Sequence, residues 1–440
     1  MLRRKLSLVS LVLLFTSLFS IPSAQAVDVL KSLKFDGSIE SRSVAINNEI
    51  DRNSSADDYR NETNTRLMFG MSFDLLDDVH SRVLLDRSPR FGTGSPSIND
   101  VESGFVFDNA YVKIDKVFGV LDLTGGKQFY GDPQDLNIYY GPQNDSILSV
   151  TSADLFRVDA SIANGFVKFQ GIAGKAAAVT TTTPLAGVVE DPTATRGTNH
   201  DTTVYGGELN TDRVIPMGNL AAYYYNAQTH AVKTAAVTGN DTLSVAGARA
   251  QGDIIAGFGY QAEYIQDFGR NNTVAGTPAY HGNAYFLNAH YGHEFDGRPV
   301  RAHIEYGRGS DDFVSIAPGR RFGIIWGEYS NFVGDTSTLN RTQATGLNNL
   351  KVFDGGIGIN ATPKLGFDFN AYRFQYDANL GGIGTSAGTE YDLIITWKHS
   401  ENVLFSVNAA DFQVGSSLHN GGVTPTNPIT QLGADVKIKF

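Results

Sequence analysis

Apolar and polar residues alternate with a period of two along much of the chain, most clearly in its last ten residues. Within 431–440, every second residue is apolar: Leu432, Ala434, Val436, Ile438 and Phe440. Because successive side chains of a strand point to opposite faces, this pattern predicts a β-strand with one apolar and one wet face. About ten residues suffice for a tilted strand to cross a bilayer, so the segment fits a membrane strand or a strand of a soluble sheet.

The same alternation recurs at 64–73, 156–162, 300–307, 390–397 and 403–410. No linker or shift in composition interrupts it, which predicts one domain over 27–440 rather than the two or three that length alone suggests. No long apolar run follows the first 26 residues. The pattern therefore excludes a polytopic helical membrane protein and is typical of a β-barrel, whose strands are apolar only at alternate positions.

The connections between the predicted strands alternate in length. Eight short turns are predicted near 76–78, 115–119, 163–164, 212–217, 251–253, 294–298, 361–364 and 399–402. Nine long polar stretches separate them, at 45–62, 88–102, 129–151, 175–201, 229–241, 269–280, 309–347, 377–388 and 414–429. Seventeen connections imply eighteen strands, and an error around 242–249 would change that count by two.

Short turns on one side and long loops on the other are the pattern of outer-membrane barrels. We therefore predict an all-β fold, a transmembrane antiparallel β-barrel of eighteen strands (sixteen to eighteen), with short periplasmic turns and long extracellular loops. A barrel of this size encloses water or a plug. The alternative is a soluble solenoid, but a solenoid needs a fixed repeat of roughly 20 to 30 residues, and the chain shows none.

The first 26 residues have the pattern of a secretory signal peptide. Arg3, Arg4 and Lys5 form its positive region, 6–19 its apolar region and 24–26 a small-residue cleavage site. The apolar run is shorter than the roughly 20 residues of a spanning helix, which predicts cleavage of 1–26 rather than an anchor. The chain has no cysteine, so neither lipoprotein acylation nor a disulfide is expected.

Charge narrows the possible partners. Removing the three cations of the predicted signal peptide from the formal net charge of −11 leaves −14 for the mature chain. No basic stripe offsets this charge, so nucleic acid is excluded as a partner. Glycine (47), phenylalanine (27) and tyrosine (19) are plentiful, which favours short strands and turns.

Several short segments resemble the alginate-export-type outer-membrane porins. They are FDNAYV at 107–112 with LDLTGGKQ at 121–128, QAEYIQ at 261–266, EYGRGSDD at 305–312, and GTEYDL at 388–393 with FQVG at 412–415. Lys127 stands where that family tends to have arginine, so bidentate anion binding is not expected there. The resemblance implies an eighteen-stranded barrel that passes an anionic polysaccharide or a smaller anionic solute. The ending at Phe440 resembles the signal that the barrel-insertion machinery reads, and a polar residue there is expected to impair assembly.

The pleat assigns charged residues to the lumen. The alternation predicts that these cations line the pore: Lys34, Arg42, Arg66, Arg82, Arg157, Lys168 and Arg301, with His303 beside Arg301. The family resemblance adds Lys127. Its acids are Asp36, Glu40, Asp159, Glu263, Glu305 and Asp392. Because selectivity is set at the constriction, these charges either form a selective ring or merely pair across neighbouring strands and keep the wall wet.

The loop at 310–347 is the longest stretch without a convincing strand and contains apolar and aromatic residues. Such residues gain by leaving water, so we expect the loop to fold into or over the pore and to place Arg320 and Arg321 at a constriction. A surface cap packed against other loops is the alternative.

No enzyme activity is predicted. The nine histidines include no His-Glu-x-x-His zinc motif, no P-loop occurs, and without cysteine no covalent haem can form. No serine-nucleophile elbow is expected either. No catalytic residue, metal or cofactor is therefore assigned.

The leading interpretation is an outer-membrane channel for passive passage or export of anionic saccharides or related small anionic solutes. The alternatives are a general or substrate-selective diffusion porin and a barrel sleeve around a partner protein. The expected surroundings are outer-membrane lipid, lipopolysaccharide and the barrel-insertion machinery, with homo-oligomers also expected.

Overall fold

The computed structural model describes residues 32–48, 59–87, 90–92, 105–142, 150–176, 202–215, 217–229, 239–255, 257–272, 279–329, 346–379, 384–418 and 427–440. The predicted signal peptide lies outside these residues, as does the part of the predicted long loop at 330–345.

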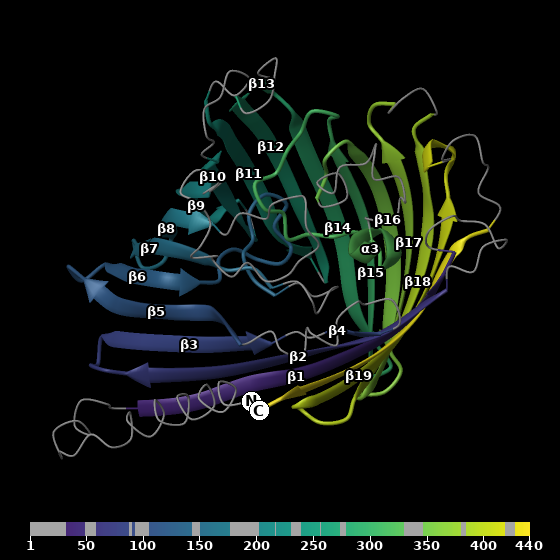
Figure 1. The fold of residues 1–440 in the computed structure, drawn as a ribbon, viewed down its shortest axis with the longest axis horizontal. Helices are drawn as coiled ribbons and strands as arrows, with labels where there is room; N and C mark the ends of the chain where they lie inside the picture. The colour runs from purple at the N-terminus through teal and green to yellow at the C-terminus, as the bar shows by residue number, and fades with distance from the viewer. Residues whose placement is uncertain are drawn as a thin grey trace, which may run out of the picture.

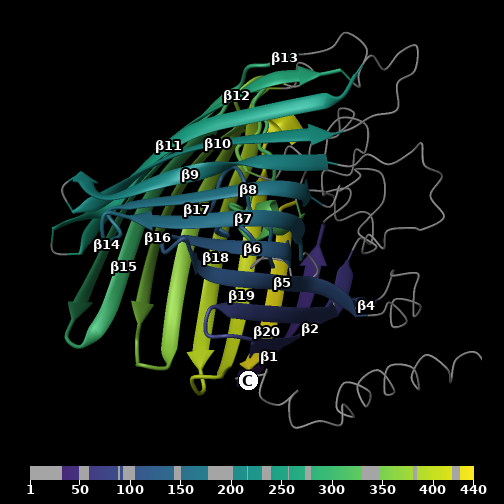
Figure 2. The same ribbon diagram turned by 90° about the vertical axis from the view of Figure 1, so that its left-hand side faces the viewer.

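The described residues form one closed antiparallel sheet (Figures 1 and 2). Its long strands are β1 (Ser32–Asn47), β2 (Arg60–Asp74), β3 (Val79–Arg87), β5 (Val106–Val117), β6 (Leu121–Gln128), β7 (Ala153–Ile162), β8 (Val167–Ala176), β9 (Thr202–Ile215), β10 (Gly218–Thr229), β11 (Asp241–Ile255), β12 (Phe258–Asn271), β14 (Asn283–Phe295), β15 (Arg298–Gly309), β16 (Leu350–Asn360), β17 (Leu365–Tyr376), β18 (Ser386–Lys398), β19 (Val403–Val414) and β20 (Ile429–Lys439). The prediction of an eighteen-stranded antiparallel barrel is confirmed.

The first and last long strands close the barrel. β1 pairs with β20 from Ser38 opposite Lys439 to Asn47 opposite Thr430. Two short strands, β4 (Arg90–Gly92) and β13 (Ala279–Tyr280), extend the sheet by pairing with β2 and β12. Since every long strand has two neighbours, the sheet has no free edge.

One predicted turn is wrong by a few residues. Gly252 and Asp253 suggest a turn, but β11 continues to Ile255 and pairs with β12 through these positions. Gly257, directly before β12, adopts φ +90°, a conformation that glycine reaches without a Cβ clash. Pairing of β11 with β12 keeps Gly252 and Asp253 in the strand despite their preference for turns. The number of strands is unaffected.

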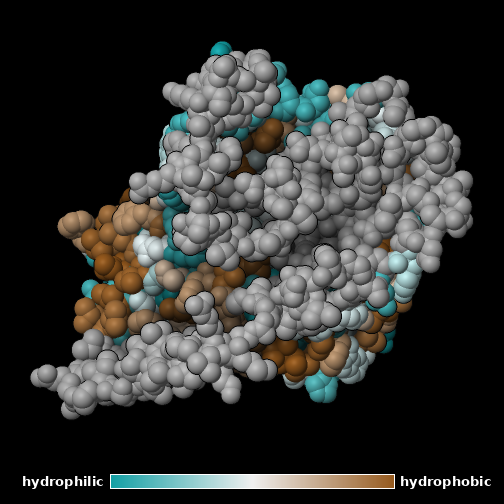
Figure 3. Space-filling view, in the orientation of Figure 1, coloured by the Kyte–Doolittle hydropathy of each residue, from teal (hydrophilic) through white to brown (hydrophobic). Residues whose placement is uncertain are grey.

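The two faces of the wall differ as the alternation predicts. On β15 the outward Ile304 is 58% exposed, whereas the inward Glu305 next to it is 9% exposed. Hydrophobic residues gather on the left and lower flanks in Figure 3, as lipid contact requires.

The helices among the described residues are short. α3 (Ile325–Tyr329) lies within the ring of strands in Figure 1, and η3 (Ser416–Leu418) follows β19. Among the described residues, no helix combines the length and the apolar character needed to cross a membrane.

Candidate functional site

Two connecting segments, 129–142 and 310–329, pack together against the inner face of the wall, and we call them the inner segments. Ala317 donates its backbone N–H to the carbonyl of Asn137 (2.8 Å), and Tyr139 donates its N–H to the carbonyl of Ala317 (2.7 Å). The Ser315 hydroxyl donates to the carbonyl of Leu136 (2.9 Å). These bonds join the two inner segments through one parallel bridge between Ile138 and Ala317.

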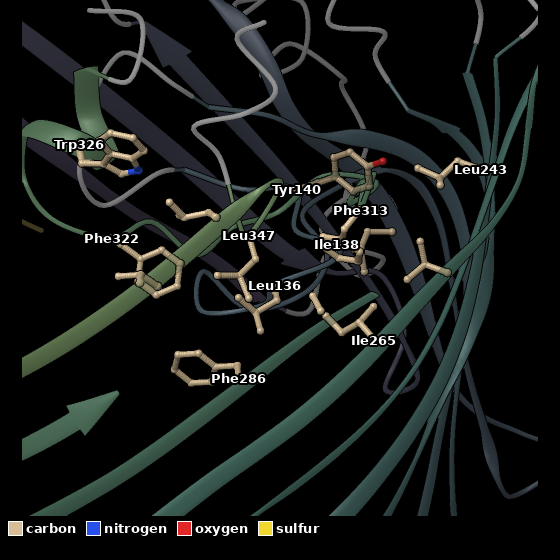
Figure 4. Close-up of a cluster of buried hydrophobic side chains, with 14 of the residues drawn as sticks. Leu136, Ile138, Tyr140, Leu243, Ile265, Phe286, Phe313, Phe322, Trp326 and Leu347 are labelled. Carbon is tan, nitrogen blue, oxygen red and sulfur yellow. The ribbon is translucent and has the colours of Figure 1, made fainter. Parts of the chain in front are cut away.

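An apolar core forms where the inner segments meet the wall (Figure 4). Leu136 and Phe313 come from the inner segments, and Ile265 and Phe286 face them from β12 and β14. Further along, Trp326 of α3 stacks on Phe374 of β17 with ring centroids 4.7 Å apart. Full burial of a side chain of this size contributes about 1.5–3 kcal/mol, so the inner segments gain by lying inside the barrel.

Two acidic residues of β18 hold the second inner segment. Glu390, which is fully buried, accepts the backbone N–H groups of Ile325 (2.6 Å) and Trp326 (2.9 Å). Asp392 accepts the N–H of Ile324 (3.1 Å). The first backbone donors of a helix have no partner within it, so these carboxylates satisfy groups that would otherwise be buried without one.

Arg320 attaches the same segment to the neighbouring wall. Its guanidinium donates to Glu305 (2.6 Å) and lies 4.1 Å from the ring centroid of Phe286. His303 and Asp354 form a hydrogen bond of 2.9 Å beside it. The nearest ligand atoms of His303, Glu305 and Asp354 lie within 4.8 Å of one another, a spacing that suits a metal, but Arg320 already supplies a positive charge there.

The first inner segment is held by an arginine of β11. Asp135 accepts from Arg249 (2.6 Å), which also reaches Glu208 of β9 (3.3 Å). Burial raises the pKa of Asp135, and the charge of Arg249 opposes that rise. Glu263 accepts the Tyr223 hydroxyl (2.6 Å) nearby and is almost fully buried.

The wall at β20, β1, β2 and β3 is different, because its inward charges pair directly between strands. Arg66 donates to Glu40 (2.9 Å), and Lys437 lies 2.9 Å from the same carboxylate. The neighbouring pairs are Arg42 with Asp435 (2.6 Å) and Arg82 with Asp36 (2.6 Å).

Three further predicted lumen cations, Arg157, Lys168 and Arg301, are also paired. Arg157 bonds Asp159 (2.9 Å), and Lys168 bonds Asp212 (2.9 Å). Arg301 donates to Asp368 (2.8 Å). Within the described part of the chain, the inward arginines proposed from the sequence and Lys168 are therefore each balanced by an acid.

Lys127 does not line the pore as the sequence predicted. It is the register partner of Ala110 and of Asp154, and it lies 4.0 Å from the Asp154 carboxylate. Asp154 shares the outward face of β7 with Phe156, which is 52% exposed. Lys127 stands on the same side of the alternation of β6 as Leu121 and Leu123, opposite the buried Thr124 and Gln128.

Two other candidates, Arg321 and Phe440, form hydrogen bonds with backbone groups. Arg321 donates to the carbonyl of Gly327 within its own segment (2.8 Å). Phe440 pairs its backbone N–H with the carbonyl of Gly37 (3.1 Å), and its side chain is 53% exposed. Its part in assembly stays a prediction.

The chain contains one match to the Gly-x-Ser-x-Gly pattern, at 384–388, where no nucleophile elbow was expected. Ser386 opens β18 instead of linking a strand to a helix, as an elbow requires. No histidine or acid contacts its hydroxyl among the described residues, so the match carries no triad.

Sequence reasoning missed Asp135, Arg249, Asp354 and Glu390 as contributors to the site. Arg249 lies on the strand whose limits were predicted least well. The others become recognisable only once two distant segments are placed against the same wall, although Glu390 and Asp354 both sit at inward positions of their strands.

The sequence profile of the alginate export family matches residues 161–429, which is more than half of the chain. The chain belongs to the alginate export family. This family member therefore resides in the Gram-negative outer membrane as a channel of porin fold. No curated protein sequence matches it significantly.

Solved porin structures share its fold at low sequence identity. OprD of Pseudomonas aeruginosa superposes with a TM-score of 0.58 at 11% identity, covering 94% of each chain. OccAB2 of Acinetobacter baumannii gives 0.58 at 12% identity, covering 94% of this chain and 98% of its own. OccK5 of Pseudomonas aeruginosa gives 0.55 at 12% identity, covering 92% and 98%.

Proposed function

We propose that this family member lets anionic saccharides or related small anionic solutes cross the outer membrane by passive diffusion, in the direction of export or of uptake. The observation that carries the proposal is the match to the alginate export family over residues 161–429. Alginate is a polyuronate, and its carboxylates need cations along their path.

The lumen offers such cations where they are accessible. The side chain of Lys168 is 55% exposed and that of Arg301 is 46% exposed, although each forms an ion pair with one aspartate. Both lie near the short turns, which face the periplasm in outer-membrane barrels. Exposed ion pairs are weak, so a solute carboxylate can exchange with the acid at little cost.

A cavity beside Lys168 adds room for a solute. Its volume is about 550 Å³, and Lys116, Gln170 and Asn210 contribute donors to its lining, together with Asp122, Asp159 and Glu208. Weak binding at several sites along a wall permits both capture and release, as conduction requires.

A second function, a general diffusion porin, is favoured by the balance of charges. Most inward cations in the described part of the wall are matched by acids, and such a wall has no strong preference for anions. A sleeve around a partner protein is less favoured, because the inner segments already occupy part of the space inside the wall.

Planar-bilayer recordings separate the two functions. We expect oligouronates to block the current at lower concentration than neutral oligosaccharides of equal length. Combined Lys168→Gln and Arg301→Gln substitutions should weaken the oligouronate block several-fold, because two accessible cations are lost. Arg298→Gln, a matched change at an exposed residue of β15 on the outer face, should leave the block unchanged.

Equal block by charged and neutral saccharides would favour the general porin. A cation-selective current that oligouronates do not affect would contradict passage of anions.

A further inference from the structure

Three cations face outward at the ends of neighbouring strands, away from the lumen. They are Arg308 of β15, Lys351 of β16 and Arg373 of β17. Each shares its face with a residue exposed to lipid: Ile304 is 58%, Phe353 51% and Phe369 44% exposed. The residues of opposite parity, such as Val352 and Phe374, are buried inside the barrel. A solute in the lumen therefore does not meet these cations.

The three cations lie close together. Arg308 is the register partner of Lys351, and Arg373 is that of Phe353, two residues further along the same face of β16. Two residues along a strand span about 6.6 Å, so the group covers an area similar to that of a lipid headgroup. We call Arg308, Lys351 and Arg373 the basic patch.

The patch carries more positive than negative charge. Asp377, just beyond β17, accepts from Arg308 (2.6 Å), and the Lys351 ammonium lies 2.9 Å away. The hydrogen bond from Arg308 lowers the pKa of Asp377, so this carboxylate is ionised at neutral pH. Among the residues that the structure describes, Arg373 has no ion-pair partner and its side chain is exposed. The basic patch thus contains three cations and one carboxylate, which leaves a net charge of two positive units.

The position of the patch identifies the side of the membrane. Arg308 and Lys351 flank the long connection between β15 and β16, and long connections are extracellular in outer-membrane barrels. Tyr285, the register partner of Arg308, and Tyr306, two residues before Arg308 on β15, lie on the outer face with ring centroids 5.8 Å apart. Aromatic residues gather at the level of the headgroups, and the cations stand at that level or just beyond it.

We propose that the basic patch binds the phosphate groups of the phosphorylated glycolipid of the outer leaflet, the lipid A part of lipopolysaccharide. Arginine fits phosphate with two parallel hydrogen bonds, and lysine adds a point charge. The exposed Phe353 and Ile357 below the patch continue as an apolar surface for the acyl chains. This combination of phosphate binders above an apolar surface fits an amphipathic lipid better than a soluble phosphate.

Another outward-facing lysine, Lys127, is balanced by an acid, so a surplus of positive charge is not general on the outer face. On β6 and β7 the outward Lys127 faces Asp154, so one cation meets one acid. The patch is distinguished by its surplus of positive charge.

The test is native mass spectrometry of the purified full-length barrel titrated with bisphosphorylated lipid A. We expect the wild-type protein to bind one lipid A molecule. A triple variant with Arg308→Gln, Lys351→Gln and Arg373→Gln should bind lipid A with an affinity at least about tenfold lower. Arg298→Gln is the matched control, because it removes a cation from the other end of β15. It should bind like the wild type.

The probes distinguish the source of the phosphate. Dephosphorylated lipid A should bind the wild type as weakly as lipid A binds the triple variant, and inorganic phosphate at equal concentration should not compete. Unchanged binding by the triple variant, equal binding of dephosphorylated lipid A, or competition by inorganic phosphate would each overturn the proposal. Heat-dependent electrophoretic mobility checks that the triple variant is folded. If the triple variant does not fold, Arg373→Gln alone, which breaks no ion pair, should still weaken the binding of lipid A. Unchanged binding of lipid A by Arg373→Gln would then overturn the proposal.

Discussion

Two sectors of the barrel wall use buried charge in opposite ways. In the covered sector, β10–β12 and β14–β18, inward acids such as Glu305 and Glu390 bind the inner segments. In the open sector, β20 and β1–β3, inward acids such as Glu40 bind cations of the adjacent strands. The same types of residue thus serve to attach loops in one sector and to connect strands in the other.

The difference teaches that an inward charge does not by itself indicate a solute path. In the covered sector a mutation is expected to alter the width of the pore, and in the open sector the stability of the wall. The following predictions test that separation.

The largest effect is expected from deletion of 320–329, which removes Arg320 and α3 from the covered sector. Single-channel conductance should rise several-fold, because conductance depends on the free width of the pore. Arg82→Gln, the control in the open sector, should leave conductance nearly unchanged. Unchanged conductance in a folded deletion variant would show that the segment caps the pore instead of narrowing it.

A smaller effect is expected when one acid is removed from each sector. Glu390→Ala leaves two backbone N–H groups without their acceptor, at a cost of about 1–3 kcal/mol each to the docking of the second inner segment. Current fluctuations should increase while barrel stability changes little. Glu40→Ala removes the acid that Arg66 and Lys437 share, so unfolding in denaturant should become easier by up to about 3–5 kcal/mol, with a steady current. If Glu390→Ala instead lowered the stability of the barrel and Glu40→Ala instead increased current fluctuations, the distinction between the two sectors would be contradicted.

The smallest effect is a pH dependence confined to the covered sector. Burial raises the pKa of Asp135 above its ordinary 3.8, so the docked first inner segment binds a proton more readily than the released segment. Acidification from neutral pH toward 3.8 should therefore favour docking and reduce current fluctuations, and the benefit should be lost as pH rises through the raised pKa. Asp135→Asn should reduce this dependence, although Arg249 and Glu208 still face the position. An identical pH response in wild type and variant would rule out Asp135 as its source.

The wall could be predicted from the sequence because each strand shows its two faces locally. The alternation at 300–307, for example, is enough to place Ile304 outside and Glu305 inside. The predicted position of the turn after β11 was wrong because Gly252 and Asp253 favour a turn when their partners on β12 are not known. The prediction for Lys127 was wrong because it came from the family resemblance, whereas the alternation of β6 puts Lys127 on the face of Leu121 and Leu123.

The site was harder to predict than the wall. Arg320 was recognised as a candidate from the aromatic composition of its loop, but its partner Glu305 was grouped with the general lumen charges. The pairing of Asp135 with Arg249 joins a loop to a strand more than a hundred residues away, and no local pattern reports such a contact.

The bridge between Ile138 and Ala317 has a consequence for folding. Its neighbouring hydrogen bond, from Ser315 to Leu136, joins residues 179 positions apart. Closing so long a loop is entropically costly and slow unless the intervening strands already hold its ends together. We therefore expect the two inner segments to dock after the strands between them have paired, so the space inside the barrel would be filled in the final stage of folding.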